Sequence, residues 1–209
     1  MKYLLHIILL LNFSAPAQVA DMEKDTIHIN EVVITHYSKK FKLKDYSLRG
    51  PCYSSDNLND ASEIITLLEK LPEGELNTIN FYFNEMFQAY KRHPENLQAR
   101  DFELLIYKVN SDNTPGERLL HETMLLHLDK DHMGGVEVNI SGLGIKNPSK
   151  LFVGLKLLGK RAKNDFMIDC LCSGHDKYMT LYRTDAASPW SRRWACAALK
   201  VDVNVAVKR

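Results

Sequence analysis

The sequence has no excess of charge of either sign. Lys and Arg together number 27, and Asp and Glu together number 26, which gives a formal net charge of +1 at pH 7. Proteins that bind nucleic acid or an anionic membrane surface usually carry a basic composition or a basic patch. The balanced charge therefore argues against a nucleic-acid partner and against electrostatic attachment to a membrane.

Sequence motifs that carry catalytic chemistry are also missing. The chain has no Gly-x-Ser-x-Gly nucleophile elbow and no glycine-rich phosphate-binding loop. His121 and Glu122 do not begin a zinc-protease helix, because the next histidine, His127, is too far along the chain to share their helix face. We therefore predict no catalytic residue and no cofactor, and we expect a protein that is not an enzyme.

A calcium loop is incomplete as well. Residues 129–134 begin like one, with Asp-Lys-Asp-His-Met-Gly, but Met133 and Ile140 occupy positions where the ion needs oxygen ligands. Asp and Gly are favoured in tight turns for conformational reasons alone. We interpret this stretch as a hairpin turn.

Long apolar runs are absent except at the N-terminus. Lys2 precedes an apolar run from Leu4 to Phe13, and Ala15-Pro-Ala17 forms a small-x-small cleavage site. The run is shorter than the roughly 20 residues that cross a bilayer. A buried N-terminal element is the alternative. We predict a signal peptide over residues 1–17, a mature chain that starts at Gln18 without a transmembrane segment, and export to the periplasm or cell surface.

The segment after the signal peptide has a β-prone run. Residues 30–35, Asn-Glu-Val-Val-Ile-Thr, resemble the TonB box of outer-membrane transporters, which adds a strand to the sheet edge of a partner. An ordinary edge strand or a passive tail are the alternatives. Residues 39–44 are interpreted as a short basic linker. We therefore predict an N-terminal strand or tail with its linker over residues 18–45, followed by one domain over residues 46–209.

Cysteine is scarce, with only four in the chain, and an exported protein meets an oxidising compartment. We expect at least one disulfide, and three pairings are open. The alternative is a soft-metal site built on Cys170-x-Cys172 with His175 and Asp176, but it needs a fourth ligand from elsewhere. We predict no metal site, and the candidate disulfide residues are Cys52, Cys170, Cys172 and Cys196.

Clear helical periodicity is rare, whereas strand patterns are frequent. Residues 102–109 are apolar on both faces, as in a central strand covered on both sides. Residues 199–207 alternate between apolar and polar side chains. Residues 57–71 fit either a helix or a strand, and we favour a strand. Further strands are expected at residues 79–83, 136–140, 151–157, 166–171 and 178–182, with a type II turn at Pro115-Gly116 and a long polar loop over residues 85–100.

Many short strands separated by turns predict an all-β fold, a two-sheet antiparallel sandwich. The order of seven segments resembles exported, mostly uncharacterised β-sandwich proteins of Bacteroidetes-type bacteria. The resemblance covers about residues 62–158 and implies a jelly-roll-like arrangement, an exported destination and no catalytic motif. The segments are Ser62-Glu63-Ile64, Leu71-Pro72, Ile79 to Phe83, Phe102 to Val109, Thr114-Pro115-Gly116, Gly134 to Ile140, and Phe152-Val153-Gly154-Leu155.

Both tryptophans lie in one short stretch, Trp190-Ser-Arg-Arg-Trp194. Exposed aromatic side chains flanked by arginine can stack on a sugar ring or on an extended peptide. The alternative is that one tryptophan fills the end of the sandwich. Our candidate ligand-binding residues are Trp190, Arg192, Arg193 and Trp194.

These patterns together predict an exported, non-enzymatic binding or assembly module with a glycan or protein ligand. Two other functions stay open. One is an accessory protein that docks to an outer-membrane transport system through its N-terminal strand. The other is a hydrolase whose site the sequence does not show.

Overall fold

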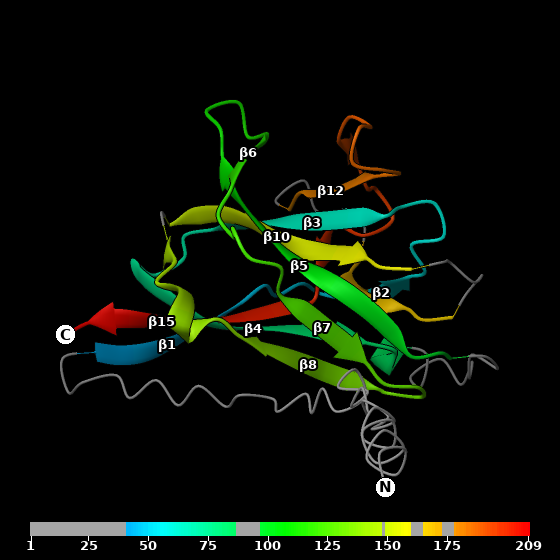
Figure 1. The fold of residues 1–209 in the computed structure, drawn as a ribbon, viewed down its shortest axis with the longest axis horizontal. Coiled ribbons are helices and arrows are strands. Elements are labelled where there is room, and N and C mark those ends of the chain that lie inside the picture. The colour runs from blue at the N-terminus through cyan, green and yellow to red at the C-terminus, as the bar shows by residue number, and fades with distance from the viewer. Residues whose placement is uncertain (1–40, 87–96, 148, 160–164, 173–177) are drawn as a thin grey trace, which may run out of the picture. The chain divides into compact units, whose positions relative to one another are not determined.

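A computed structural model describes residues 41–86, 97–147, 149–159, 165–172 and 178–209 (Figure 1). The predicted signal peptide and the TonB-box-like segment lie outside these residues, as do positions 87–96 of the predicted long loop. The described residues form two antiparallel β-sheets, and their one named helical element is a single 3-10 turn, η1 (Ser141–Leu143).

The first sheet is built around the long strand β4 (Gly74–Phe83), so we name it the β4 sheet. β15 (Val201–Lys208) and β8 (Gly134–Asn139) pair with β4, and β1 (Phe41–Ser47) pairs with the far side of β15. The short strands of this sheet are β2 (Tyr53–Asp56), β9 (Lys146–Asn147), β11 (Ile168–Leu171) and β14 (Ala198–Leu199).

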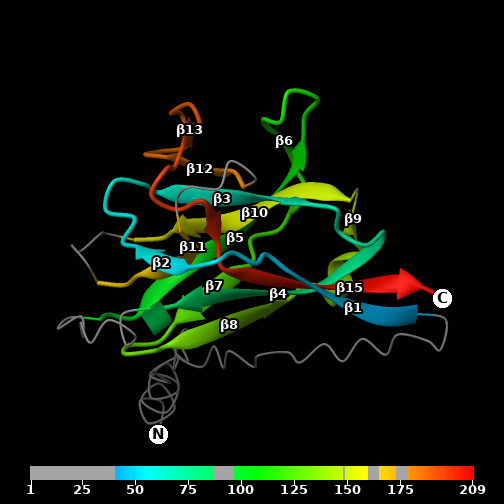
Figure 2. The ribbon, with the colours of Figure 1, turned by 180° about the vertical axis from the view of Figure 1, so that it is seen from behind.

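The second sheet is built around β10 (Lys150–Leu157), and we name it the β10 sheet. β10 lies between β3 (Glu63–Glu69) and β5 (Arg100–Val109), which confirms the predicted central position of residues 102–109. The other strands are β6 (Pro115–Arg118), β7 (Leu125–Leu128), β12 (Thr180–Arg183) and β13 (Ser191–Arg192). In both views, β6 and the β12–β13 pair stand out from the side of this sheet that faces away from the β4 sheet (Figures 1 and 2).

The strand order is that of a jelly roll. Neighbouring strands run β1-β15-β4-β8 in one sheet and β3-β10-β5-β7 in the other. Among the eight strands of this order, the chain passes from one sheet to the other at every connection except that from β5 to β7. Two Greek keys of this kind make the double-sheet jelly roll. The predicted antiparallel sandwich is therefore confirmed. The remaining strands extend both sheets, with β2, β9, β11 and β14 in the β4 sheet and β6, β12 and β13 in the β10 sheet.

The main core lies between the two sheets. Phe102 is its centre, with ring centroids 5.4 Å from Phe83 and 5.1 Å from Phe166. Full burial of an aliphatic or aromatic side chain stabilises the fold by roughly 1.5–3 kcal/mol, so these strands are held mainly by their inward faces. The inward side chains include Ile64, Leu68, Ile79, Phe81, Leu104, Ile106, Leu151, Val153, Leu155, Val201, Val203 and Val205.

The predicted basic linker is wrong for residues 41–44. They belong to β1, which pairs with β15 along its whole length, from Phe41 opposite Lys208 to Ser47 opposite Asp202. Lys42 and Lys44 are exposed on this edge strand. Lysine on an edge strand discourages pairing with another chain, which explains a charge run inside a sheet.

The predicted type II turn at Pro115-Gly116 is also wrong. The reversal occurs earlier, where Asn113 takes the left-handed conformation with φ 62°. Its N–H donates to the Asn110 carbonyl at 3.0 Å, and the Asn110 N–H donates to the Thr114 carbonyl at 2.9 Å. Asparagine tolerates this conformation. Gly116 is needed for space instead, since a Cβ there would lie 2.5 Å from Asn110 Oδ1.

The stretch from Asp129 to Gly134 is a turn but not a hairpin. β7 pairs with β5 in the β10 sheet, whereas β8 pairs with β4 in the other sheet. The turn therefore carries the chain between the sheets. Asp131 and Gly134 supply its positive φ angles, 62° and 111°.

Candidate functional site

The outward face of the β10 sheet carries a second apolar cluster. Its buried members are Ile65, Leu67, Leu105 and Phe152, which we call the outer cluster. The strand register places Phe152 between Leu67 and Tyr107. This cluster explains why residues 102–109 are apolar on both faces.

Trp190 belongs to the outer cluster. Its ring meets the Tyr107 ring edge to face, with centroids 5.9 Å apart, and the Arg183 guanidinium lies 4.5 Å from its centroid. The sequence suggested either a ligand platform or a plug at the end of the sandwich. The structure places Trp190 on the outer face of the β10 sheet, where it is half-buried against its own chain.

Side chains of alternating charge border the outer cluster at one end. Arg183 pairs with Glu63 at 2.6 Å, while Arg118 and Lys156 pair with Glu103 at 2.6 and 3.1 Å. Burial by itself raises the pKa of Glu103, but the hydrogen bonds from Arg118 and Lys156 outweigh burial and hold that pKa below its ordinary value. These cations are therefore neutralised by carboxylates of the same sheet.

Trp194, unlike the half-buried Trp190, faces solvent, with 66% of the residue exposed. It is the most exposed large hydrophobic residue in the described part of the chain. The Arg192 guanidinium lies 4.3 Å from its ring centroid and also donates to the Tyr178 carbonyl at 3.2 Å. We call Arg192 and Trp194 the Trp194 platform.

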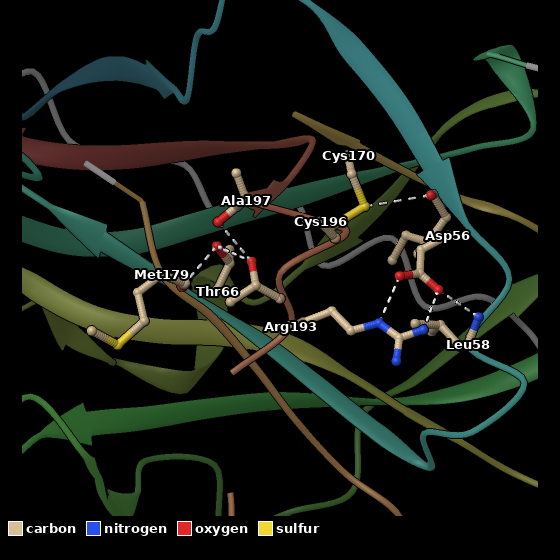
Figure 3. The surroundings of a disulfide bond; sticks show 10 residues. Asp56, Leu58, Thr66, Cys170, Met179, Arg193, Cys196 and Ala197 are labelled. Atoms are coloured by element: carbon tan, nitrogen blue, oxygen red, sulfur yellow. Dashed lines mark hydrogen bonds and ion pairs between the residues drawn. A yellow bond between two sulfur atoms is a disulfide. The ribbon is translucent and has the colours of Figure 1, made fainter. Parts of the chain in front are cut away.

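Arg193 does not face solvent with its neighbours. Its guanidinium makes two hydrogen bonds to the Asp56 carboxylate, at 2.7 and 2.8 Å (Figure 3). It makes a third to Asp60 at 2.6 Å. Asp56 also accepts the Leu58 N–H at 2.9 Å. The hydrogen bonds that Arg193 donates to Asp56 and Asp60 raise the pKa of Arg193 despite its burial. Arg193 therefore anchors the segment that carries Trp194.

A disulfide anchors the other side of Trp194. Cys196 is bonded to Cys170 of β11, and both residues are fully buried (Figure 3). The Arg193 N–H donates to the Thr180 carbonyl at 2.8 Å, and the Ala197 N–H donates to the Leu171 carbonyl at 3.1 Å. Trp194 thus projects from a short backbone segment that is tied down before and after it.

All four cysteines are paired, since Cys52 is bonded to Cys172 in a second disulfide. Of the three pairings that the sequence left open, the structure has Cys52 with Cys172 and Cys170 with Cys196. Cys170 and Cys172 are therefore not thiolate ligands, while the other two residues of the soft-metal alternative, His175 and Asp176, lie outside the described residues. Within those residues no group of three His, Cys, Asp or Glu is arranged to hold a metal ion.

Two disulfides indicate a non-cytoplasmic, oxidising compartment. Across the parts of the chain that the structure describes, no helix has the length and apolar character needed to cross a membrane.

Asp169 in β11 is the most deeply buried carboxylate of the described residues, and the sequence patterns above did not identify it. It is fully buried and accepts the N–H groups of Glu85 and Met86 at 3.2 and 3.4 Å. Lys200 pairs with Glu85 and lies over the Tyr82 ring at 4.1 Å. The position of Asp169 inside the apolar run from Phe166 to Leu171 was the signal in the sequence that could have indicated its burial. Because Asp169 does not reach solvent, we assign it a structural role.

Burial raises the pKa of Asp169 to about 6, against the partial compensation of the Met86 N–H and Lys200. The folded protein therefore holds a proton that the unfolded chain releases near pH 4. It follows that this group lowers stability as pH rises from about 4 to about 6.

We expect Asp169→Asn to remove this loss of folding stability with rising pH. In denaturant unfolding, the stability of the wild type relative to the variant should fall by up to about 3 kcal/mol between pH 4 and pH 7. Glu137→Gln, at an exposed position of β8, is the control and should leave the wild-type pH dependence unchanged. A difference between wild type and Asp169→Asn that is constant over this range would contradict the prediction.

Comparison of the chain with known protein families, with curated proteins and with solved structures finds no match. The resemblance to exported β-sandwich proteins therefore stays an expectation from the order of the segments.

Proposed function

We propose that this protein is an exported, non-enzymatic binding module of the periplasm or cell surface, which takes a carbohydrate ligand on the Trp194 platform. The observation that carries the proposal is the exposure of a tryptophan on a fixed backbone. Burial of exposed aromatic surface is a strong driving force for binding, and tryptophan is enriched among binding hot spots.

The anchors on both sides of Trp194 support this function. A side chain that is already held in one place loses less conformational entropy when a ligand binds. Arg193 with its two carboxylates, and Cys196 with its disulfide, keep the backbone of Trp194 in one position. Arg192 covers one side of the indole ring, and the exposed remainder suits the apolar face of a sugar ring.

A carbohydrate fits this place better than an extended peptide. Peptides that bind to sheets usually add a strand to a free edge, and their affinity comes from main-chain hydrogen bonds. The edge strand next to Trp194 is β13, which consists of two residues, Ser191 and Arg192. So short an edge offers few backbone groups to a peptide strand.

We expect Trp194→Ala to weaken carbohydrate binding by roughly thirtyfold, the effect of a hot-spot residue worth about 2 kcal/mol. A glycan array identifies the ligand, and calorimetric titration of wild type and variant measures the change. Leu125→Ala is the matched control, because Leu125 is 60% exposed and lies in β7. The Leu125→Ala variant should bind the carbohydrate with the affinity of the wild type.

Both variants should keep the wild-type melting temperature, since they change exposed side chains. A ligand that binds Trp194→Ala as tightly as the wild type would contradict the proposal. Binding to a protein partner with no signal on the glycan array would contradict the choice of ligand.

A further inference from the structure

A cavity of about 420 Å³ opens where the connection between β1 and β2 passes the end of β3. Cavities of this size are within the range that small ligands occupy. The lining residues that matter here are Tyr46, Arg49, Leu67, Glu69, Lys70 and Tyr178.

Two tyrosine rings form fixed walls of this cavity. The Tyr46 hydroxyl donates to the Glu69 carbonyl at 2.7 Å, and the Tyr178 hydroxyl donates to the Arg49 carbonyl at 2.5 Å. Burial raises the pKa of Tyr46, so its hydroxyl stays protonated and keeps this hydrogen bond. Leu67 of the outer cluster adds an apolar surface. The cavity therefore exists before any ligand arrives.

Cationic side chains outnumber carboxylates among the residues that line the cavity. Among the described residues, the side chains of Arg49 and Lys70 make no ion pair, although both line the cavity and both are exposed. The one carboxylate there, Glu69, pairs with Lys150 at 2.7 Å. Arg118, Arg183 and Arg193, in contrast, are all paired with carboxylates.

Tyr178 lines the cavity and also contacts the platform. The carbonyl of Tyr178 accepts the hydrogen bond from Arg192, and Arg192 stacks on Trp194. Arg192 also makes no ion pair among the described residues. Three cations that have no carboxylate partner within the described part of the chain, Arg49, Lys70 and Arg192, therefore lie near the aromatic side chains of Tyr46, Tyr178 and Trp194.

We propose that the ligand is an acidic oligosaccharide, with one sugar ring on Trp194 and the anionic group of a neighbouring sugar in the cavity. Arg49 and Lys70 bind the anionic group, since a guanidinium matches a carboxylate or sulfate with two parallel hydrogen bonds and an ammonium adds a point charge. This inference rests on the proposed function, because it names the ligand class of the same platform.

The test is a calorimetric titration with three oligosaccharides of equal length, one neutral, one carrying uronic acids and one carrying sulfates. The wild type should bind at least one of the acidic oligosaccharides roughly tenfold more tightly than the neutral one, as expected for hydrogen bonds to a charged group. The two acidic ligands distinguish a carboxylate from a sulfate.

Variants separate the cavity from the platform. Arg49→Gln and Lys70→Gln should each weaken acidic binding several-fold, leave the neutral oligosaccharide unaffected, and reduce the sensitivity of acidic binding to salt. Lys42→Gln, at an exposed lysine of β1, is the control and should change nothing. Unchanged melting temperatures exclude a folding defect.

The two proposals fail in different ways. If the neutral oligosaccharide binds as tightly as both acidic ones and Arg49→Gln changes no affinity, the acidic ligand is wrong, while a loss of binding in Trp194→Ala still supports the platform. If none of the oligosaccharides binds, the carbohydrate function fails, and the acidic ligand fails with it.

Discussion

A chain in which alanine replaces both Cys52 and Cys172 is expected to lose about 4–5 kcal/mol of stability against unfolding. The two cysteines are separated by 120 residues in the sequence. A disulfide restricts the unfolded chain, and in the chain-entropy description the restriction grows with the length of the loop it closes. Such a loss is a large part of the stability of an ordinary domain, about 5–15 kcal/mol.

The second disulfide provides the comparison. Cys170 and Cys196 are separated by only 26 residues, so the loop contribution of their disulfide is smaller, about 3–4 kcal/mol. Both are fully buried, so their replacement also disturbs the core beneath Trp194. Replacing Cys52 and Cys172 should therefore lower stability and spare ligand affinity, whereas replacing Cys170 and Cys196 should lower both.

Denaturant unfolding and calorimetric titration measure these two effects. Thiol titration of the denatured, unreduced wild type should find no free thiol. Four free thiols would refute the pairing, and so would an unchanged unfolding midpoint in both double variants.

The strands were predictable because their signal is local. Residues 102–109 and 201–207 owe their strands to side-chain patterns that a sequence displays directly. β1 was missed because its pattern is weak and its lysines resemble a solvated linker. Its strand character comes from pairing with β15, at the other end of the chain, which local propensity does not report.

The candidate site was predictable only as a stretch of sequence. Trp190 and Trp194 are four residues apart with similar neighbours, yet one packs on the outer cluster and the other is exposed. Likewise, Arg192 and Arg193 are adjacent, but it is Arg193 that pairs with Asp56 and Asp60, whereas Arg192 stacks on Trp194. These assignments depend on where β2 and β3 lie relative to β13, which the sequence alone does not contain. The cavity at Tyr46 and Tyr178 depends on the same placement.

We expect Arg193→Met to cost about 3–5 kcal/mol, the loss seen when one partner of a buried ion pair is removed. Asp56 would keep its charge in a place where only 5% of its side chain is accessible, without the two hydrogen bonds that satisfy it now. Thermal or denaturant unfolding measures the loss. Asp60→Asn is the matched control, because 56% of the Asp60 side chain is accessible and an exposed pair contributes at most about 1 kcal/mol.

The double variant Asp56→Asn with Arg193→Met decides whether the loss comes from the unpaired charge. It removes the buried charge together with its partner, so it should be more stable than Arg193→Met alone. Ligand affinity should be lower than wild type both in Arg193→Met and in the double variant, because in both Trp194 has lost the anchor that precedes it. Recovery of wild-type affinity in the double variant would show that the Arg193 anchor does not position Trp194, and that Cys196 and the neighbouring backbone hydrogen bonds suffice.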